Sequence, residues 1–145
     1  MKSIALILSL AGMSMASVCG SLNVTSQADF DAQAADCTIV NGDLEIASSF
    51  SDDYADSHKI TVITGSLIAR NLSLMSVFIP ALTTIGGDFE LTGTFYDPSF
   101  PSLMNIRGDF MIASEQGIYC SNFDNLRNSE GLQGKFECVG DIEEQ

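Results

Sequence analysis

A short pattern that returns five times along the chain constrains its fold more than any other feature. Each copy consists of a glycine, a polar residue, a leucine or phenylalanine, any residue, and an apolar or cysteine position. The glycines of the five copies recur at a nearly even spacing; they are Gly42, Gly65, Gly87, Gly108 and Gly134. A short, regular period of this kind is typical of folds that stack one structural unit on the next.

Apolar and polar residues alternate within each copy, and a further apolar residue lies two positions before each glycine. This is the period of a β-strand. One such strand cannot bury its apolar side alone, whereas strands stacked about 4.8 Å apart share inward ladders. The sequence therefore predicts a mainly β fold, a single parallel β-solenoid of about five coils. Its main inward ladder consists of Leu44, Leu67, Phe89, Phe110 and Phe136.

The stretches between the copies do not sustain a 3.6-residue apolar rhythm, so we expect short helices mainly at the two ends. A helix is predicted to start at Ser26. Ser121 is expected to cap a second helix that has Phe123 and Leu126 on one face. These helices would cover the open ends of the stack. Residues 48–58 are the least patterned stretch and are expected to form a loop at one edge.

Residues 1–16 have the pattern of a secretory signal peptide. The charged Lys2, the apolar run 4–12 and the small residues Ser14 and Ala16 predict cleavage after Ala16, which leaves one domain over residues 17–145. The apolar run is shorter than a membrane span and no second one follows, so no membrane span is expected. An N-terminal core strand is the less favoured alternative, because nothing nearby alternates or pairs with this run.

Export would place the four cysteines in an oxidising compartment, where we expect them to be paired. Three pairings are possible. The separation between Cys19 and Cys37 equals that between Cys120 and Cys138, and this equal spacing favours one disulfide at each end of the domain. Each pair would bracket one of the predicted end helices and hold it to the stack.

Two Asn-x-Ser/Thr triplets, which begin at Asn23 and Asn71, are predicted N-glycosylation sites on a secreted chain. Loss of Lys2 with the leader would leave 5 basic and 19 acidic residues, a net charge of −14. A surface of this charge repels nucleic acid and anionic membranes, so neither is an expected partner. The acidity is interpreted as a means of solubility in an extracellular space.

Several stretches together resemble the receptor L-domain superfamily in its fungal cell-wall-organisation branch. They are Cys37 ahead of the first Gly-Asp-Leu strand, the Pro-x-Leu-x-x-Ile-x-Gly stretches from Pro80 and Pro101, and Cys120-Ser-Asn-Phe-Asp-Asn-Leu followed by Gly134-Lys-Phe-Glu-Cys138. The resemblance implies a right-handed parallel coil similar to L-domain and leucine-rich-repeat folds, without catalysis, that acts at the cell surface in wall integrity. Family members are usually longer and end in a lipid-anchor signal. This sequence ends in Asp141-Ile-Glu-Glu-Gln145, so a short, secreted relative without a lipid anchor is expected.

Asp88 and Asp109 would be direct neighbours in the stack, because both follow the glycine of their copy. Carboxylates about 5 Å apart could hold a hard cation such as calcium, or act as a general-acid pair. No third ligand or Asp-rich calcium loop accompanies them, so we interpret them as part of a solvated sheet. No metal or other cofactor is predicted.

An enzyme that cleaves glycans is the alternative that parallel β-coils raise by fold analogy. Such an enzyme needs aromatic platforms for sugar, and this chain has no Trp and few exposed-looking aromatic residues beyond Tyr54, Tyr96 and Tyr119. His58 is the single histidine, without a free cysteine or a serine motif to complete a triad, and is interpreted as a loop residue. No catalytic residue is therefore predicted.

Arg107-Gly108-Asp109 spells an adhesion tripeptide, but it occupies the position where the other copies have their glycine and aspartate. The position of the tripeptide in the repeat therefore explains its sequence.

The first hypothesis is a secreted, non-enzymatic structural or interaction protein of the fungal cell wall or extracellular space. The second is a soluble ligand-binding module similar to receptor L domains, and the third is the glycan-cleaving enzyme. The expected partner is an extracellular protein or a cell-wall glycan.

Overall fold

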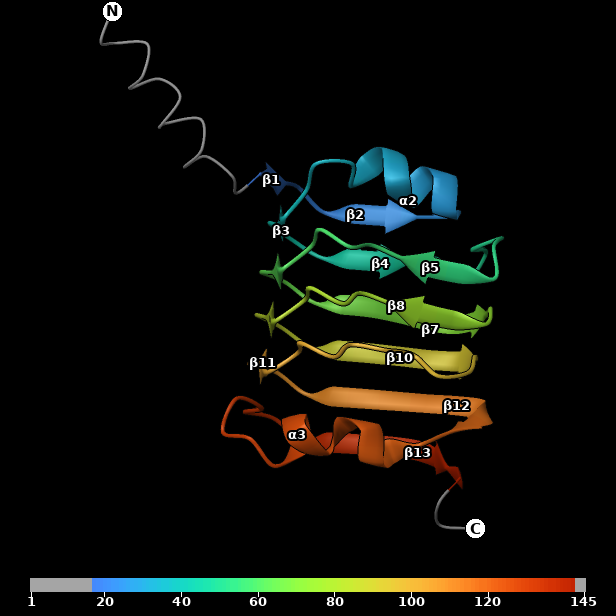
Figure 1. The fold of residues 1–145 in the computed structure, drawn as a ribbon, viewed down its shortest axis with the longest axis vertical. Coiled ribbons are helices and arrows are strands. Elements are labelled where there is room, and N and C mark those ends of the chain that lie inside the picture. The colour runs from blue at the N-terminus through green and yellow to red at the C-terminus, as the bar shows by residue number, and fades with distance from the viewer. Residues whose placement is uncertain (1–16, 143–145) are drawn as a thin grey trace, which may run out of the picture.

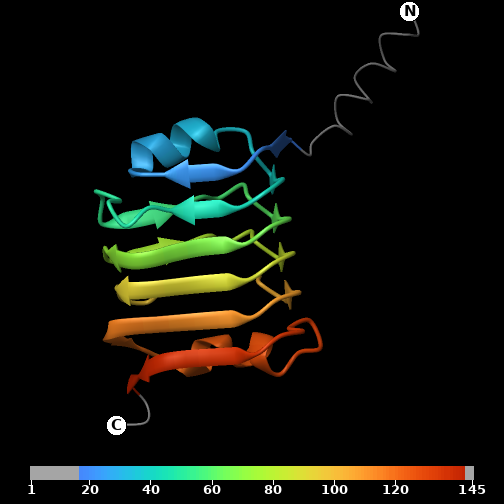
Figure 2. The same ribbon diagram turned by 180° about the vertical axis from the view of Figure 1, so that it is seen from behind.

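The computed structural model describes residues 17–142, and the predicted signal peptide 1–16 lies outside them. The described chain is mainly β, with three parallel sheets and few helices, as the sequence predicts (Figures 1 and 2). In spatial order, the five-stranded sheet contains β1 (Val18–Cys19), β3 (Ile39–Val40), β6 (Val62–Ile63), β9 (Thr84–Ile85) and β11 (Asn105–Ile106). The six-stranded sheet contains β2 (Leu22–Val24), β4 (Leu44–Ile46), β7 (Leu67–Ser73), β10 (Phe89–Thr94), β12 (Phe110–Ile118) and β13 (Phe136–Asp141). The two-stranded sheet contains β5 (Tyr54–Asp56) and β8 (Ser76–Phe78).

Successive passes of the chain lie above one another, and we refer to each pass as a layer (Figure 1). Layer one contains β1 and β2, layer two β3 to β5, and layer three β6 to β8. Layer four contains β9 and β10, layer five β11 and β12, and layer six β13. Within each sheet, every strand pairs in parallel with the strand of the adjacent layer.

Layer one corrects the expected number of coils, because it adds a sixth copy of the repeat to the five found in the sequence. Its residues Gly20-Ser21-Leu22-Asn23-Val24 follow the pattern and begin one repeat length before Gly42. Leu22 pairs with Leu44 in the six-stranded sheet. The expected count of five omits this copy because it directly follows the predicted leader.

The predicted ladder forms the centre of the core. Leu44, Leu67, Phe89, Phe110 and Phe136 are in register on adjacent strands, and Leu22 extends the ladder at its upper end. The ring of Phe110 stacks on those of Phe89 and Phe136, with centroids 4.5 Å and 4.9 Å apart. All but Phe136 are buried, so the inward side of the strand pattern is confirmed.

Short helices lie in the first and fifth layers. Helix α2 (Gln27–Gln33) packs against β2 and β5, and its N-cap Ser26 accepts a 3.0 Å hydrogen bond from the backbone N–H of Asp29. This bond satisfies one of the free N–H groups at the start of a helix. The ring of Phe30 is buried and covers the upper end of the core, which is the role expected of the first helix.

The second helical segment consists of a 3-10 turn η1 (Cys120–Phe123) followed by α3 (Asp124–Arg127). Phe123 and Leu126 are buried, as expected, but the prediction that Ser121 caps the helix is wrong. Ser121 lies inside η1. The N–H of Cys120 instead donates to the Asp141 carboxylate at 3.4 Å, so the start of the segment is satisfied from layer six.

Two disulfides join Cys19 to Cys37 and Cys120 to Cys138, with Cα atoms 5.7 Å and 6.1 Å apart. These are the two pairs that the equal spacing favours. Each disulfide brackets one of the helical segments along the chain. The two ends of the stack, where strands lack a neighbour on one side, are therefore the cross-linked parts of the molecule.

Candidate functional site

The polar residue after each glycine forms a hydrogen-bonded ladder through the stack. Oδ1 of Asp88 accepts from the backbone N–H of Asp109 at 2.8 Å, and Oδ1 of Asp109 accepts from that of Lys135 at 2.9 Å. The same bond links Ser21 to Asp43, Asp43 to Ser66, and Ser66 to Asp88. These side chains therefore satisfy backbone donors, which accounts for their position in the repeat.

The glycines make room for this ladder. A Cβ atom on Gly108 would overlap both Oδ1 of Asp88 and the carbonyl oxygen of Gly87 in the layer before. Gly42 has the additional constraint of a φ of +141°, which side chains other than glycine rarely adopt. The glycine of one layer and the aspartate or serine of the previous layer are thus a linked pair, and both have a structural role.

Asp88 and Asp109 are neighbours, as expected, but both carboxylates are engaged in the ladder. Within residues 17–142, no group of three or more His, Cys, Asp or Glu side chains lies close enough together to hold a metal ion. Through Oδ1, each carboxylate binds a backbone donor of the next layer.

The outer face of the six-stranded sheet carries a second, mixed column, which consists of Asn23, Glu45, Ile68, Glu90, Met111 and Glu137. Arg70 binds Glu90 through two parallel hydrogen bonds, Nε to Oε2 at 2.8 Å and Nη2 to Oε1 at 2.9 Å. These bonds and the charge of Glu90 raise the pKa of Arg70 above its ordinary value. This largely exposed ion pair joins adjacent strands of the sheet.

The Arg107-Gly108-Asp109 tripeptide lies between β11 and β12 rather than on a protruding loop. The backbone N–H of Arg107 donates to the carbonyl of Ile85 at 3.1 Å, and Asp109 belongs to the ladder. Both ends of the tripeptide are therefore fixed in the stack.

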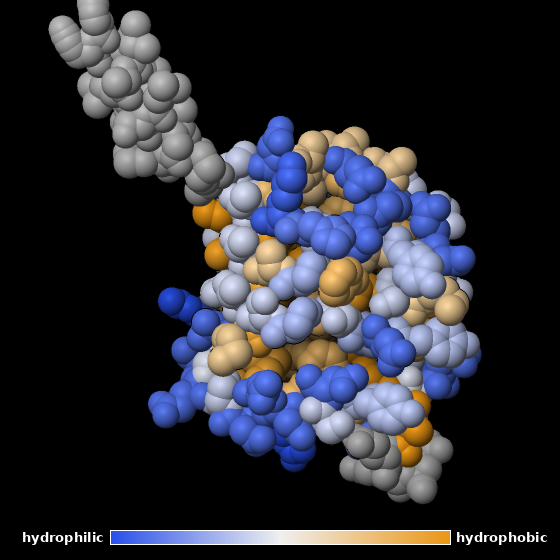
Figure 3. Space-filling view, in the orientation of Figure 1, coloured by the Kyte–Doolittle hydropathy of each residue, from blue (hydrophilic) through white to orange (hydrophobic). Residues whose placement is uncertain are grey.

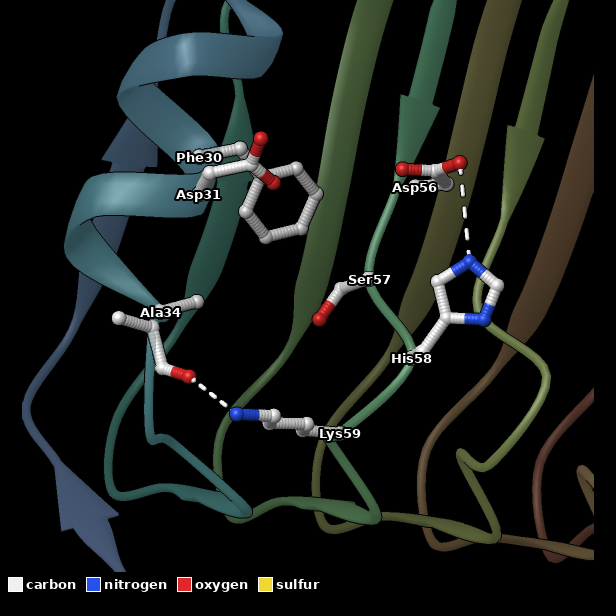
Figure 4. Close-up of a pocket in the computed structure, with 8 residues that line it drawn as sticks. Phe30, Asp31, Ala34, Asp56, Ser57, His58 and Lys59 are labelled. Carbon is white, nitrogen blue, oxygen red and sulfur yellow. Dashed lines mark hydrogen bonds and ion pairs between the residues drawn. The ribbon is translucent and has the colours of Figure 1, made fainter.

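His58 lies at a shallow pocket of about 360 Å³ between α2 and the chain that follows β5 (Figure 4). Its Nε2 atom is 3.8 Å from Oδ2 of Asp56, and its ring makes an edge contact with Phe78. The side chain of Ser57 points toward α2 and that of His58 points away from it (Figure 4). No hydrogen bond joins Ser57 to His58 in the described chain, so the three consecutive residues do not form a catalytic triad.

Lys59 completes this pocket from the side of the helix. Its Nζ atom donates to the carbonyl of Ala35 at 2.9 Å and lies 3.6 Å from a carboxylate oxygen of Asp36. A positively charged side chain near the carbonyl groups at a helix C-terminus stabilises the helix, and Lys59 has this position relative to α2. Within this pocket, His58 is therefore near Asp56, and Lys59 binds the chain that follows α2.

Both predicted glycosylation sites are accessible. Asn23 is exposed on the outward side of β2, and Asn71 is exposed in β7 with a φ of +57°, next to a register shift between β7 and β10. Attachment of glycans at these residues stays a prediction. Glycans there would stand on the outer side of the six-stranded sheet.

Three tyrosines and a methionine lie near the edge where strands of the six-stranded sheet end. Tyr54 begins β5, Tyr96 follows β10 by two residues, and Tyr119 directly follows β12. Met75 lies between β7 and β8. The exposed fractions of Tyr54, Tyr96, Tyr119 and Met75 are 57%, 43%, 43% and 40% respectively. The sequence suggests that the three tyrosines are exposed, but it gives no sign that they share one edge.

Comparison with known proteins finds relatives among fungal surface proteins. The chain is 31% identical over 99 residues to a "Cell surface GPI-anchored protein" of Arthroderma benhamiae, an alignment that covers 67% of this chain. It is 35% identical over 99 residues to "Protein ecm33" of Aspergillus fumigatus, with 52% of this chain covered. It is 32% identical over 105 residues to "Sporulation-specific protein 22" of Saccharomyces cerevisiae, with 69% covered.

The chain spans about a quarter of the length of these curated relatives, since the matches cover 26%, 25% and 23% of them. No family model and no solved structure matches the chain. The resemblance to fungal cell-surface proteins is thus supported, whereas membership of the L-domain superfamily stays a prediction. Within residues 17–142, no helix is both long and apolar enough to cross a membrane.

Proposed function

We propose that this protein is a secreted, non-enzymatic structural and interaction protein of the fungal cell wall or extracellular space, built as a right-handed parallel β-solenoid of the L-domain type. The observation that carries the proposal is the six-layer parallel stack in a chain similar to fungal surface proteins. A stack of this kind presents long, rigid faces and edges on which a partner can be bound.

The use of the polar side chains supports a role without catalysis. The aspartates of the ladder accept hydrogen bonds from the backbone, Arg70 is paired with Glu90, and Lys59 binds the end of α2. An acid–base or nucleophilic mechanism requires a reactive group held toward a site where a substrate can lie. His58 and Asp56 have no such arrangement with Ser57.

The two disulfides and the acidic surface support a role outside the cell. Disulfides persist in oxidising compartments, and a strongly negative protein stays dispersed among other macromolecules. Glycans on Asn23 and Asn71 would cover part of the six-stranded sheet.

The proposal is tested by sedimentation of the purified mature protein with isolated fungal cell walls. An unrelated secreted protein of similar charge serves as the control for trapping. We expect the protein to sediment with the walls while the control stays in solution. Walls stripped of protein and walls digested with glucanase then distinguish a glycan partner from a protein partner. A protein that stays in the supernatant with every preparation contradicts the wall role.

The absence of catalysis is tested with a panel of soluble wall polysaccharides. We expect no release of reducing ends after prolonged incubation. Cleavage of any member that is also lost in the His58→Ala variant would overturn the non-enzymatic proposal.

A further inference from the structure

One exposed tyrosine or methionine lies near the same edge of the stack in each of four successive layers. We define the tyrosine row as Tyr54, Met75, Tyr96 and Tyr119. Its members belong to layers two, three, four and five, at the side of Figure 1 where β4, β7, β10 and β12 end. Figure 3 shows pale-blue aromatic side chains gathered along this side of the molecule.

Backbone hydrogen bonds place Met75 beside Tyr96 of the next layer, whereas the register partner of Tyr54 in layer three is Ser76, the residue after Met75. The N–H of Tyr96 donates to the carbonyl of Met75 at 2.7 Å, and the N–H of Met75 donates to that of Asp53 at 2.6 Å. Each of the three lower members also follows a buried residue; these are Leu74, Phe95 and Ile118. A buried side chain therefore anchors the corner in each layer, and the next residue along the chain faces solvent.

The three tyrosines present both an apolar ring and a polar tip. Their hydroxyl groups make no hydrogen bond with other residues of the described chain, so each remains available to a partner. Tyrosine is suited to this role because it offers a large contact area at a low cost in conformational entropy. Layers repeat about every 4.8 Å, so Tyr54 and Tyr96 are about 10 Å apart along the stack.

Two carboxylates accompany the row. Asp53 precedes Tyr54 and Asp97 follows Tyr96, and neither carboxylate takes part in a hydrogen bond or ion pair within residues 17–142. Asp97 has a φ of +34°, and the hydroxyl of Ser76 donates to its carbonyl at 2.8 Å, which fixes this strained corner. Carboxylates of this kind are strong acceptors for hydroxyl groups.

We propose that the tyrosine row binds an extended, uncharged glycan chain. Sugar rings have apolar C–H faces that stack on aromatic rings and hydroxyl edges that donate to carboxylates, so both features of the row have a counterpart. An anionic glycan is disfavoured because the row contains no cation and the whole chain is acidic. The inference rests on the proposed wall role and names the class of partner.

The test is affinity electrophoresis and pull-down of the mature protein with a soluble β-glucan and with chitin oligosaccharides. We expect the Tyr54→Ala/Tyr96→Ala variant to bind at least one of these about tenfold more weakly than the wild type. Tyr96→Phe should retain most of the binding, because it keeps the ring. Met104→Ala is the matched control, since Met104 is similarly exposed, at 46%, but lies outside the row.

Salt and charged glycans separate the alternatives. Binding should change little between low and high salt, and an anionic glycan such as alginate should not bind. Stronger binding to chitosan, lost in high salt, would instead indicate a cationic partner and overturn the inference.

Two outcomes distinguish a failure of the tyrosine row from a failure of the wall role. Wall binding that is equal in the wild type and the double tyrosine variant would overturn the role of the row while the wall role stands. A wild-type protein that does not sediment with walls would overturn the proposed wall role itself. Circular dichroism of each variant shows whether the fold is intact.

Discussion

Asp88 and Asp109 occupy equivalent positions in adjacent layers, and Oδ1 of Asp88 accepts a 2.8 Å hydrogen bond from the backbone N–H of Asp109. Gly108 lies beside this bond, because a Cβ atom there would overlap the same oxygen. One contact therefore explains two positions of the repeat, the small residue and the polar residue that follows it. It also gives the recurring aspartates a structural role.

Loss of the Asp88 carboxylate should destabilise the fold modestly. Asp88→Ala leaves the N–H of Asp109 without its protein partner, at a cost of about 1 kcal/mol in the free energy of unfolding. Asp88→Asn is the control, since its side-chain oxygen can accept the same bond, and should cost clearly less. Urea unfolding measures both. Equal losses in the two variants would show that the bond is not the reason for the effect.

The inward and outward sides of a strand should respond very differently to truncation. Phe89 is fully buried between Leu67 and Phe110, so Phe89→Ala should cost about 3–5 kcal/mol. Glu45→Ala, on an exposed position of the outward column, should cost less than about 0.5 kcal/mol. Glu90 is a less suitable control because it binds Arg70. Similar unfolding free energies for the two variants would contradict the assignment of the two sides.

Asp29 should make stability depend on acid pH. Hydrogen bonds from the Gln33 side chain and the Thr25 backbone lower the pKa of Asp29 below its ordinary value. A carboxyl group with a lowered pKa stabilises the fold above its unfolded-state pKa and loses this contribution as pH falls through its folded-state pKa. The stability difference between wild type and Asp29→Asn should therefore be present at neutral pH and shrink below about pH 4. A difference that grows on acidification would contradict this.

The core could be predicted from the sequence because each inward position keeps its chemical character in every copy. The ladder from Leu44 to Phe136 and the mainly β class follow from this alternation alone. The start of α2 was also predictable, since Ser26 and Asp29 form a local capping pattern.

Other features depend on contacts between layers that no local pattern encodes. The sequence predicts a loop over residues 48–58, yet this stretch contains the short strand β5, which pairs with β8. Ser121 does not cap its helix, because Asp141 reaches the start of the segment from the next layer. The tyrosine row is hidden in the sequence for the same reason: its members lie about one repeat length apart and share an edge only when the layers stack.

Parallel layers in one register underlie the whole fold, and engineered disulfides test them directly. Glu90 and Met111 are register partners on adjacent strands, whereas Ile68 and Met111 are two layers apart. A disulfide spans Cα atoms about 4.4–6.8 Å apart, which fits one layer spacing of about 4.8 Å but not two. After mild oxidation, peptide mapping by mass spectrometry should find a new disulfide in Glu90→Cys/Met111→Cys and none in Ile68→Cys/Met111→Cys. A disulfide in the second variant but not in the first would contradict the stacked register.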